Sequence, residues 1–231
     1  MTARSGVYQL FFDLDGTLTD PAPGITACIL HAVRALGRAA PPAVEMRRFI
    51  GPPLREVFAE ILATQDVARI EEAVALYRER FSTLGLYENS VYPAVPRVLA
   101  ELRSAGFQLR VVTSKAHVYA DRIIDHFGLR EFFPRVYGAE LSGERSTKTE
   151  LIGYALASER TEPRSCCMIG DRLHDIEGAK AHGIRALGVT WGYGSREELE
   201  TAGADLVIDA LEELPGAVRR LAGRSGLGSG R

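Results

Sequence analysis

Val7-Tyr8-Gln9-Leu10-Phe11-Phe12-Asp13-Leu14-Asp15-Gly16-Thr17 joins an apolar run to a pair of carboxylates near the start of the chain. The run stops at Asp13, as a buried parallel strand does where it reaches a site. Asp13 and Asp15 lie two residues apart, so an extended backbone points both side chains to one side. Gly16 permits the chain to turn immediately afterwards. The stretch therefore predicts the first strand of an α/β fold, ending in a site with two acids.

The composition of the 231 residues is that of one globular domain, or of one domain with an insertion. Hydrophobic residues make up 46% and charged residues 25%, which is enough for a core and excludes disorder as the main state. The 28 basic and 30 acidic residues leave a net charge of −2. Because no basic block is present to follow a phosphate backbone, we expect no nucleic-acid polymer as a partner.

Targeting signals and cysteine usage both indicate a cytoplasmic protein. No apolar run approaches the roughly 18 residues that span a bilayer, and the first residues become acidic where a signal peptide is most apolar. We therefore expect no membrane partner. Cys28, Cys166 and Cys167 are odd in number and lack metal-ligand spacing. They indicate small core residues in a reducing compartment.

Apolar runs and helical patterns alternate along most of the chain. After the first strand, strands are expected over 109–112, 136–137, 166–169, 186–189 and 206–208. Helices are expected over 96–104, 118–127, 147–158, 175–182 and 211–221. Such alternation predicts a parallel sheet covered by helices on both faces, the doubly wound α/β architecture.

A helical insertion of about 70 residues interrupts this alternation. Apolar residues have helical spacing over 24–36, 47–50, 54–62 and 67–84, with no strand signal between them. We assign residues 1–20 and 88–222 to the α/β core and residues 21–87 to a helical cap domain. Residues 223–231, rich in Gly and Ser, have too little to bury and are predicted to be disordered.

Two further apolar runs end in polar clusters, Thr113-Ser114-Lys115 and Gly170-Asp171-Arg172-Leu173-His174-Asp175. Ligands of open α/β sheets bind at the carboxyl ends of strands, so these clusters are expected to meet Asp13 and Asp15. Several carboxylates in one place repel each other and require a cation. Oxygen ligands without paired histidines or thiolates favour Mg²⁺ over zinc. Lys148, opening a helix, adds a fixed positive charge, and the set suits a phosphoryl group.

At this point the sequence resembles the haloacid dehalogenase (HAD) superfamily over nearly its whole length. The four motifs appear in order as Asp13-Leu14-Asp15-Gly16-Thr17, Thr113, Lys148, and Gly170-Asp171 with Asp175. The resemblance implies a Rossmann-like core with a C1 cap, as in subfamily I. Phe49 to Arg55 and Gly143 to Lys148 resemble the branch of 5′-nucleotidase-like and phosphoglycolate-phosphatase-like proteins. Thr149 departs from the Lys-Pro pair that many relatives carry at the third motif.

The resemblance implies roles for these residues that agree with their chemistry. Asp13 is expected to attack phosphorus and form an aspartyl-phosphate, and Asp15 to act as acid and then base. Thr113 and Lys148 complete the catalytic set. Mg²⁺ is expected on the side chains of Asp13 and Asp171 and the carbonyl of Asp15, with Asp175 either a ligand or behind the metal. Substrate and phosphate binding are assigned to Gly16, Thr17, Ser114, Lys115 and Arg55.

Each assignment has a plainer alternative. The alternative for Lys148 is a solvated surface lysine, and for Lys115 this alternative is stronger still. Arg55 is equally compatible with an exposed arginine at a helix start. Trp191-Gly192-Tyr193-Gly194 borders the predicted site or merely packs under a loop. The histidines have no partners at metal-ligand spacing, so surface roles are expected for them.

The leading hypothesis is a Mg²⁺-dependent phosphomonoesterase for a small phosphorylated metabolite, first nucleoside monophosphates and then phosphoglycolate. A β-phosphoglucomutase-like phosphotransferase is the alternative, since the core motifs are shared. A non-catalytic HAD-fold binding module is a third hypothesis, against which the intact motif residues argue. Asp15 separates the chain from the superfamily's dehalogenases, which lack that acid and need no Mg²⁺. A monomer and a homodimer are both compatible with the sequence.

Overall fold

A six-stranded parallel sheet forms the centre of the computed structural model, which describes residues 8–224. The strand order is β5-β4-β1-β6-β7-β8, with every neighbouring pair parallel. The strands are β1 (Gln9–Phe12), β4 (Gln108–Ala116), β5 (Val136–Ala139), β6 (Cys166–Gly170), β7 (Arg185–Val189) and β8 (Leu206–Ile208). All four residues of β1 are buried, which explains the uninterrupted apolar run in its sequence.

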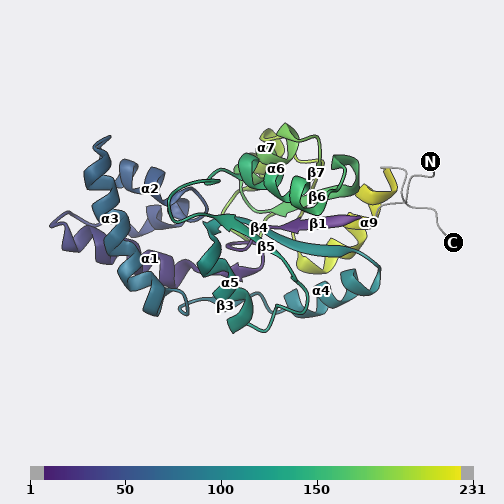
Figure 1. The fold of residues 1–231 in the computed structure, drawn as a ribbon, viewed down its shortest axis with the longest axis horizontal. Helices are drawn as coiled ribbons and strands as arrows, with labels where there is room; N and C mark the ends of the chain where they lie inside the picture. Colours follow the sequence, from purple (N-terminus) through teal and green to yellow (C-terminus); the bar gives the residue numbers. More distant parts are fainter. Residues whose placement is uncertain (1–7, 225–231) are drawn as a thin grey trace.

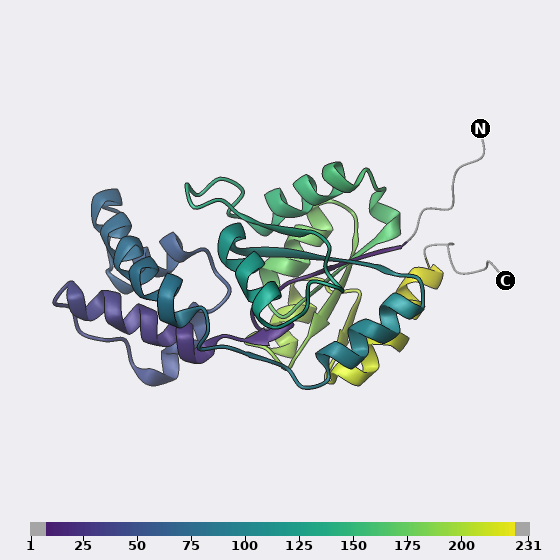
Figure 2. The ribbon, with the colours of Figure 1, turned by 60° about the horizontal axis from the view of Figure 1, so that its bottom comes forward.

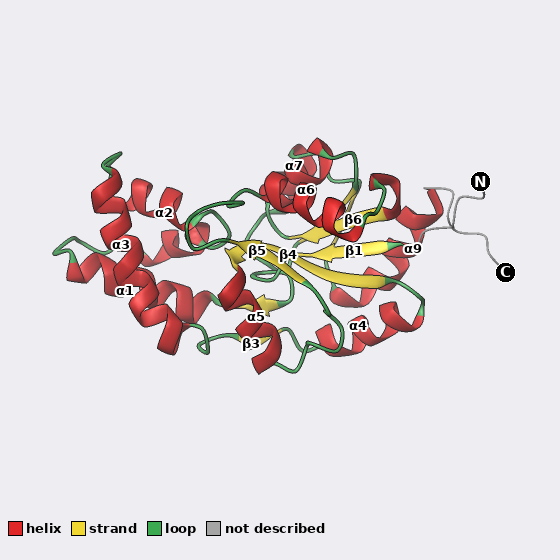
Figure 3. Ribbon diagram, viewed as in Figure 1, coloured by secondary structure: helices red, strands yellow, loops and turns green. Residues whose placement is uncertain are grey.

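Helices cover both faces of the sheet, as Figures 1 and 3 show. Leu10 and Phe12 of β1 face the side packed by α4 (Val95–Ser104), α5 (His117–His126) and α9 (Leu214–Arg224). Phe11 faces the other side, packed by α6 (Lys148–Glu159), α7 (Leu173–Ala181) and α8 (Arg196–Thr201). The predicted doubly wound α/β fold is thereby confirmed.

The helical insertion lies beyond one end of the sheet (Figure 2). It contains α1 (Ala22–Ala35), a 3₁₀ helix over Ala43–Phe49, α2 (Leu54–Ile61) and α3 (Val67–Arg80), which continues as a π-helical turn over Phe81–Gly85. Two short strands, β2 (Thr19–Asp20) and β3 (Ser90–Val91), pair antiparallel where the chain passes between core and insertion. The predicted boundaries after residues 20 and 87 fall beside this pair.

Several details differ from the expectations of the sequence. The β2–β3 pair and α8 were not predicted, because each is short and carries polar residues. The expected helix over 67–84 changes to π-helical form after Arg80. Gly223 and Arg224 belong to α9 rather than to a disordered tail. The rest of that predicted tail, residues 225–231, lies outside the described residues.

The cysteines agree with the sequence analysis. Cys28, Cys166 and Cys167 are all buried and unbridged, as expected of small core residues. Between residues 8 and 224, no helix has the length and apolarity that crossing a membrane requires.

We expect Leu10→Ala to destabilise the protein by about 2–5 kcal/mol, because this fully buried side chain lies in the central strand and its removal leaves a cavity. Urea unfolding followed by circular dichroism will show this as a lower midpoint. Val44→Ala is the matched control, since Val44 is 89% exposed and its loss should change stability by less than about 0.5 kcal/mol. Equal midpoints for the two variants would contradict this packing.

Candidate active site

The carboxyl ends of three neighbouring strands bring the predicted motifs together. β1 lies between β4 and β6, so the residues that follow these strands share one edge of the sheet. The Asp13 amide still donates to the Ile169 carbonyl, at 2.9 Å, which fixes the first acid beside β6. Thr113 lies in β4, and Asp171 follows β6 directly. All three residues are buried at this edge.

Three buried carboxylates form the deepest part of the site. Asp13, Asp171 and Asp175 each offer an oxygen, and these atoms all lie within 4.8 Å of one another. Burial, followed by the charges of Asp175 and Asp13, raises the pKa of Asp171 well above its ordinary value. Burial also raises the pKa of Asp175 to about 6, although Lys148 acts against it. Burial and mutual repulsion therefore disfavour the ionised form of this cluster unless positive charge is added.

Lys148 provides part of that charge from the start of α6. Its ammonium lies 2.8 Å from an oxygen of Asp13 and 2.8 Å from an oxygen of Asp175, and it donates to the Val112 carbonyl at 3.0 Å. Burial lowers the pKa of Lys148, but the two carboxylates outweigh it and the net shift is upward. The lysine is therefore a permanent cation that holds the Asp13 carboxylate in one orientation.

A capping box places Lys148 although the usual proline is absent. The Thr147 hydroxyl accepts from the Glu150 amide at 3.3 Å, and the Glu150 carboxylate accepts from the Thr147 amide at 3.1 Å. These bonds satisfy the first donors of α6 and start the helix at Lys148. Thr149 consequently replaces proline without moving the lysine away from the site.

Lys115 is paired with the second acid of the first motif. Its ammonium lies 2.7 Å from Asp15 and 4.6 Å from the ring centre of Phe81, and its side chain is only 7% exposed. The alternative of a solvated surface lysine is therefore wrong. Burial raises the pKa of Asp15, Lys115 opposes this, and the charge of Asp13 adds to it, with an upward net shift. A raised pKa suits a carboxyl group that has to give and take a proton.

Gly16 and Thr17 contact Asp171 rather than the wall of the cavity. The Thr17 hydroxyl donates to Asp171 at 3.1 Å, and a Cβ on Gly16, whose φ is +85°, would lie 2.2 Å from the same carboxylate. The Gly16 amide donates to the Thr19 carbonyl at 2.7 Å. Only glycine fits here, because both the backbone conformation and the space exclude a side chain.

The loop after β7, whose role the sequence left open, supplies a hydrogen-bond donor to Asp171. The Tyr193 amide donates to the second oxygen of Asp171 at 2.9 Å. A Cβ on Gly192 would come within 2.3 Å of this carboxylate, so the loop approaches it as closely as backbone permits. The Trp191–Gly194 motif was visible as a cluster of aromatic and glycine residues after a strand, but no sequence signal tied it to Asp171.

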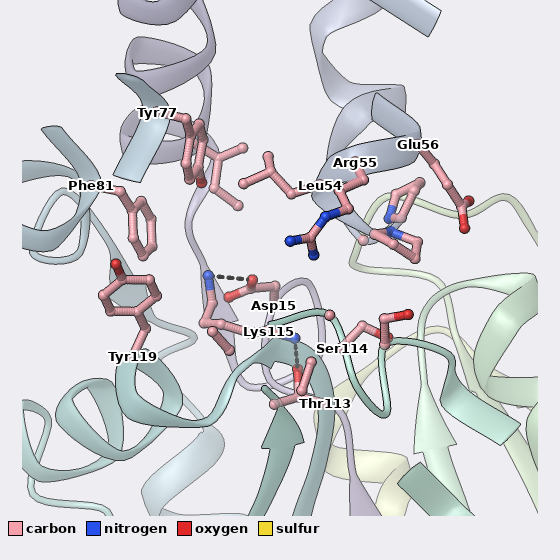
Figure 4. A pocket seen from close by; sticks show the side chains of 18 of the residues that line it. Asp15, Leu54, Arg55, Glu56, Tyr77, Phe81, Thr113, Ser114, Lys115 and Tyr119 are labelled. Atoms are coloured by element: carbon pink, nitrogen blue, oxygen red, sulfur yellow. Dashed lines mark hydrogen bonds and ion pairs between the residues drawn. The ribbon is translucent and has the colours of Figure 1, made fainter. Parts of the chain in front are cut away.

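A cavity of about 420 Å³ opens from these acids toward the helical insertion. Asp13, Asp15, Thr113, Ser114 and Lys115 line its core side. Figure 4 shows Lys115 pointing to Asp15, while Tyr77, Phe81 and Tyr119 gather on one side. Tyr77 and Phe81 stack with ring centres 5.3 Å apart, and Tyr119 meets Phe81 edge-on at 5.2 Å. The cavity therefore combines a charged floor with an aromatic wall.

Arg55 reaches into the cavity from α2, opposite the aromatic wall (Figure 4). Its guanidinium binds the Glu71 carboxylate with two nitrogens, one of them at 3.1 Å, and this contact lowers the pKa of Glu71. The side chain is 35% exposed. Arg55 thus lines the cavity, with its charge already partnered by Glu71.

The charge balance of the site fits a divalent cation. Four buried acids, Asp13, Asp15, Asp171 and Asp175, face the two ammonium groups of Lys115 and Lys148. Fully ionised, this set carries a net charge of −2, which one divalent ion neutralises. Its donors are carboxylate oxygens, the ligands of hard cations. Asp175 already binds Lys148 and the Arg172 amide, which favours a place behind the ion.

A doubly wound parallel sheet whose strand ends carry paired aspartates, a threonine and a buried lysine–aspartate pair defines a hydrolase of the haloacid dehalogenase type. The chain belongs to the haloacid dehalogenase-like hydrolase family, whose model matches residues 10–189. It is an enzyme of the phosphatase group within that superfamily.

Similar proteins of known sequence or structure support this placement. A 5′-nucleotidase of Pseudomonas aeruginosa is 46% identical over 191 residues, covering 83% of this chain and 86% of its own. The tyrosine-protein kinase PtkA of Mycobacterium tuberculosis is 38% identical, over 90% of this chain and 72% of its own. The crystal structure of a predicted phosphatase from Clostridium acetobutylicum superposes with a TM-score of 0.89 and 36% identity, covering 93% of this chain and 100% of that one.

We expect Asp13→Asn to lower phosphate release by at least about 10³-fold, because the amide is too weak a nucleophile to accept a phosphoryl group. Steady-state release of inorganic phosphate measures the loss, and thermal unfolding checks that the variant folds. Asp125→Asn is the matched control, since Asp125 is an exposed acid of α5 that pairs with Arg130, which follows the helix. Activity above about a tenth of the wild type in Asp13→Asn would overturn the assignment of the nucleophile.

Proposed function

We propose that this protein is a Mg²⁺-dependent phosphomonoesterase of small metabolites that works through an aspartyl-phosphate on Asp13. The observation that carries the proposal is the arrangement of the two acids that follow β1. Asp13 is held by Lys148 at 2.8 Å, while Asp15, two residues on, has a raised pKa and its own lysine partner. The first carboxylate is held in place by a cation for attack, and the raised pKa of the second suits proton exchange.

In the first half of the reaction, a carboxylate oxygen of Asp13 attacks phosphorus in line with the ester oxygen that leaves. The phosphorus–ester bond breaks, and Asp15 gives its proton to the departing oxygen. In the second half, Asp15 takes a proton from water as that water attacks the phosphorus of the aspartyl-phosphate. Inorganic phosphate is released, and Asp13 returns to its starting state.

Other residues of the chain bind and orient the phosphoryl group. Thr113 and the amides of Ser114 and Lys115 line the floor of the cavity, and Lys148 adds its ammonium beside Asp13. Asp13, Asp171 and the Asp15 carbonyl would hold Mg²⁺, with Asp175 supporting the cluster. When bound, the ion neutralises charge on the phosphoryl oxygens in the transition state.

The cavity favours a nucleoside monophosphate over phosphoglycolate as substrate. A volume of about 420 Å³ falls within the ~300–1,000 Å³ typical of pockets for larger ligands, and a two-carbon acid would fill little of it. Tyr77 and Lys115 cover Phe81, so the partly exposed ring of Tyr119 is the part of the aromatic wall that offers a surface to a base. Arg55 and Lys115 already have carboxylate partners, so neither is free to bind the carboxylate of phosphoglycolate.

Phosphoryl transfer to a hydroxyl group is a second candidate, which the similarity to PtkA and the shared core motifs favour. The first half of the reaction is the same, and the acceptor alone differs. A hydroxyl of a sugar or a tyrosine would replace water in attacking the aspartyl-phosphate. Transfer and hydrolysis are therefore separated by measuring where the phosphoryl group goes.

We expect phosphate release from nucleoside 5′-monophosphates to exceed that from ribose 5-phosphate and phosphoglycolate in kcat/KM. Release should stop in EDTA and return with excess Mg²⁺, since the net charge of the site requires the ion. A coupled assay for inorganic phosphate over this panel, with an activated aryl phosphate included, makes the measurement. Transfer of labelled phosphate to a sugar or tyrosine acceptor without release would support the second candidate and contradict hydrolysis.

We expect Tyr119→Ala to lower kcat/KM for AMP about fivefold or more, because a stacked base contributes ~1–3 kcal/mol. The value for ribose 5-phosphate should hardly change, since that substrate has no base. Val118→Ala on the same helix is the control, with an exposed side chain outside the cavity. Equal losses on both substrates would show that Tyr119 shapes the site in general and does not contact a base.

A further inference from the structure

Arg172 follows Asp171 directly and extends from the core to the helical insertion. Its Nη1 donates to the carbonyl of Ile50 at 2.7 Å, and its Nε donates to the carboxylate of Glu198 at 2.8 Å. The side chain is only 13% exposed. We propose that Arg172 is a positioning residue that docks the loop 50–53 of the insertion onto the Asp171 loop, and so sets the cavity in its substrate-binding form.

The core end of this contact is rigid. The same Glu198 oxygen also accepts from the Leu173 amide at 2.8 Å, and Glu198 lies in the first turn of α8, capped by Ser195. The Arg172 amide donates to Asp175 at 3.1 Å. Contacts within the core therefore fix the orientation of the guanidinium independently of the insertion, because they bind both the backbone of Arg172 and its Nε.

The insertion end of the contact fits closely around the arginine. Gly51 has a φ of +109°, and a Cβ there would come within 3.1 Å of the Arg172 stem. Pro52 and Pro53 follow and stiffen the path to α2, where Leu54 and Arg55 line the cavity. A shift at residue 50 is consequently passed to the residues that meet the substrate.

A second contact between insertion and core lies on the other side of Asp171. The guanidinium of Arg47 lies 5.1 Å from the ring centre of Tyr193, and the Tyr193 amide donates to Asp171. Arg47 also donates to the Gly192 carbonyl at 3.5 Å. Arg172 and Tyr193, the two residues that join the insertion here, thus flank the same carboxylate.

The contact between Arg172 and Ile50 is suited to opening and closing. Its acceptor is a neutral carbonyl, whereas the ion pair of Arg172 with Glu198 lies within the core and does not involve the insertion. Lysine is a poor substitute, because only the planar guanidinium donates from separate nitrogens to two acceptors in fixed directions. The inference rests on the proposed function for its kinetic effect, whereas the docking itself is measurable without a substrate.

The experiment compares Arg172→Met and Arg172→Lys with the wild type, with Arg196→Met as control. Arg196 is an exposed arginine of α8 whose ion pairs, to Glu200 and Asp209, lie within the core. Hydrogen–deuterium exchange on the substrate-free protein should be faster in both Arg172 variants over residues 50–58 and unchanged in β6. For AMP, Arg172→Met should lower kcat/KM about tenfold, mainly through KM, as loss of one charged hydrogen bond implies. Arg172→Lys should restore only part of it.

Three outcomes would overturn the docking role. Unchanged exchange over residues 50–58 would show that the insertion does not depend on Arg172. Full recovery by Arg172→Lys would show that charge alone matters. If the wild type released phosphate from no ester, the proposed function would fail, and the exchange comparison would still decide the docking. Faster exchange in β6 as well would mean general destabilisation and would also reject the proposal.

Discussion

The ammonium of Lys148, buried between Asp13 and Asp175, is the interaction on which the rest of the site depends. Removing such charges from water costs several kcal/mol per ion, and only close partners offset this cost. The lysine meets two carboxylates at 2.8 Å and a backbone carbonyl at 3.0 Å. Lys148 opens α6, whereas Asp13 follows β1, Val112 lies in β4 and Asp175 lies in α7. The same group therefore ties four elements together at the edge of the sheet.

Close approach of backbone to carboxylate is the second condition for this site. Added Cβ atoms at Gly16 and Gly192 would both collide with Asp171, and one at Gly170 would collide with Asp175. These positions leave no room for a side chain, so the acids are surrounded by main chain and by the hydroxyl of Thr17. Such a rigid environment keeps the carboxylates in place while the substrate changes.

Much of the fold and of the acid cluster was predictable, because parallel strands buried on both faces leave uninterrupted apolar runs. The order of such runs places their polar ends on one edge, which brings Asp13, Thr113 and Asp171 together. Lys148 was predictable as well, since it opens a helix at the position of the third motif.

Other features depend on contacts that no local pattern records. Lys115 is buried because Phe81, from the insertion, covers it. Arg172 reaches Ile50, which is 122 residues away in the chain. The roles of Gly16 and Thr17 also needed coordinates, because a glycine and a threonine beside a strand suit phosphate as well as they suit a neighbouring carboxylate. Sequence patterns identify elements and chemistry, whereas partners across the fold follow from the way the elements pack.

The pairing of β2 with β3 has a consequence for how such an enzyme diversifies. Thr19 lies opposite Val91 and Asp20 opposite Ser90, so the insertion leaves and re-enters the core at neighbouring positions, about 4.8 Å apart. An inserted segment whose two ends are adjacent can be lengthened, shortened or exchanged without disturbing the register of the sheet. Under the proposed function, the residues that act on the phosphoryl group and the insertion that covers them can therefore change separately.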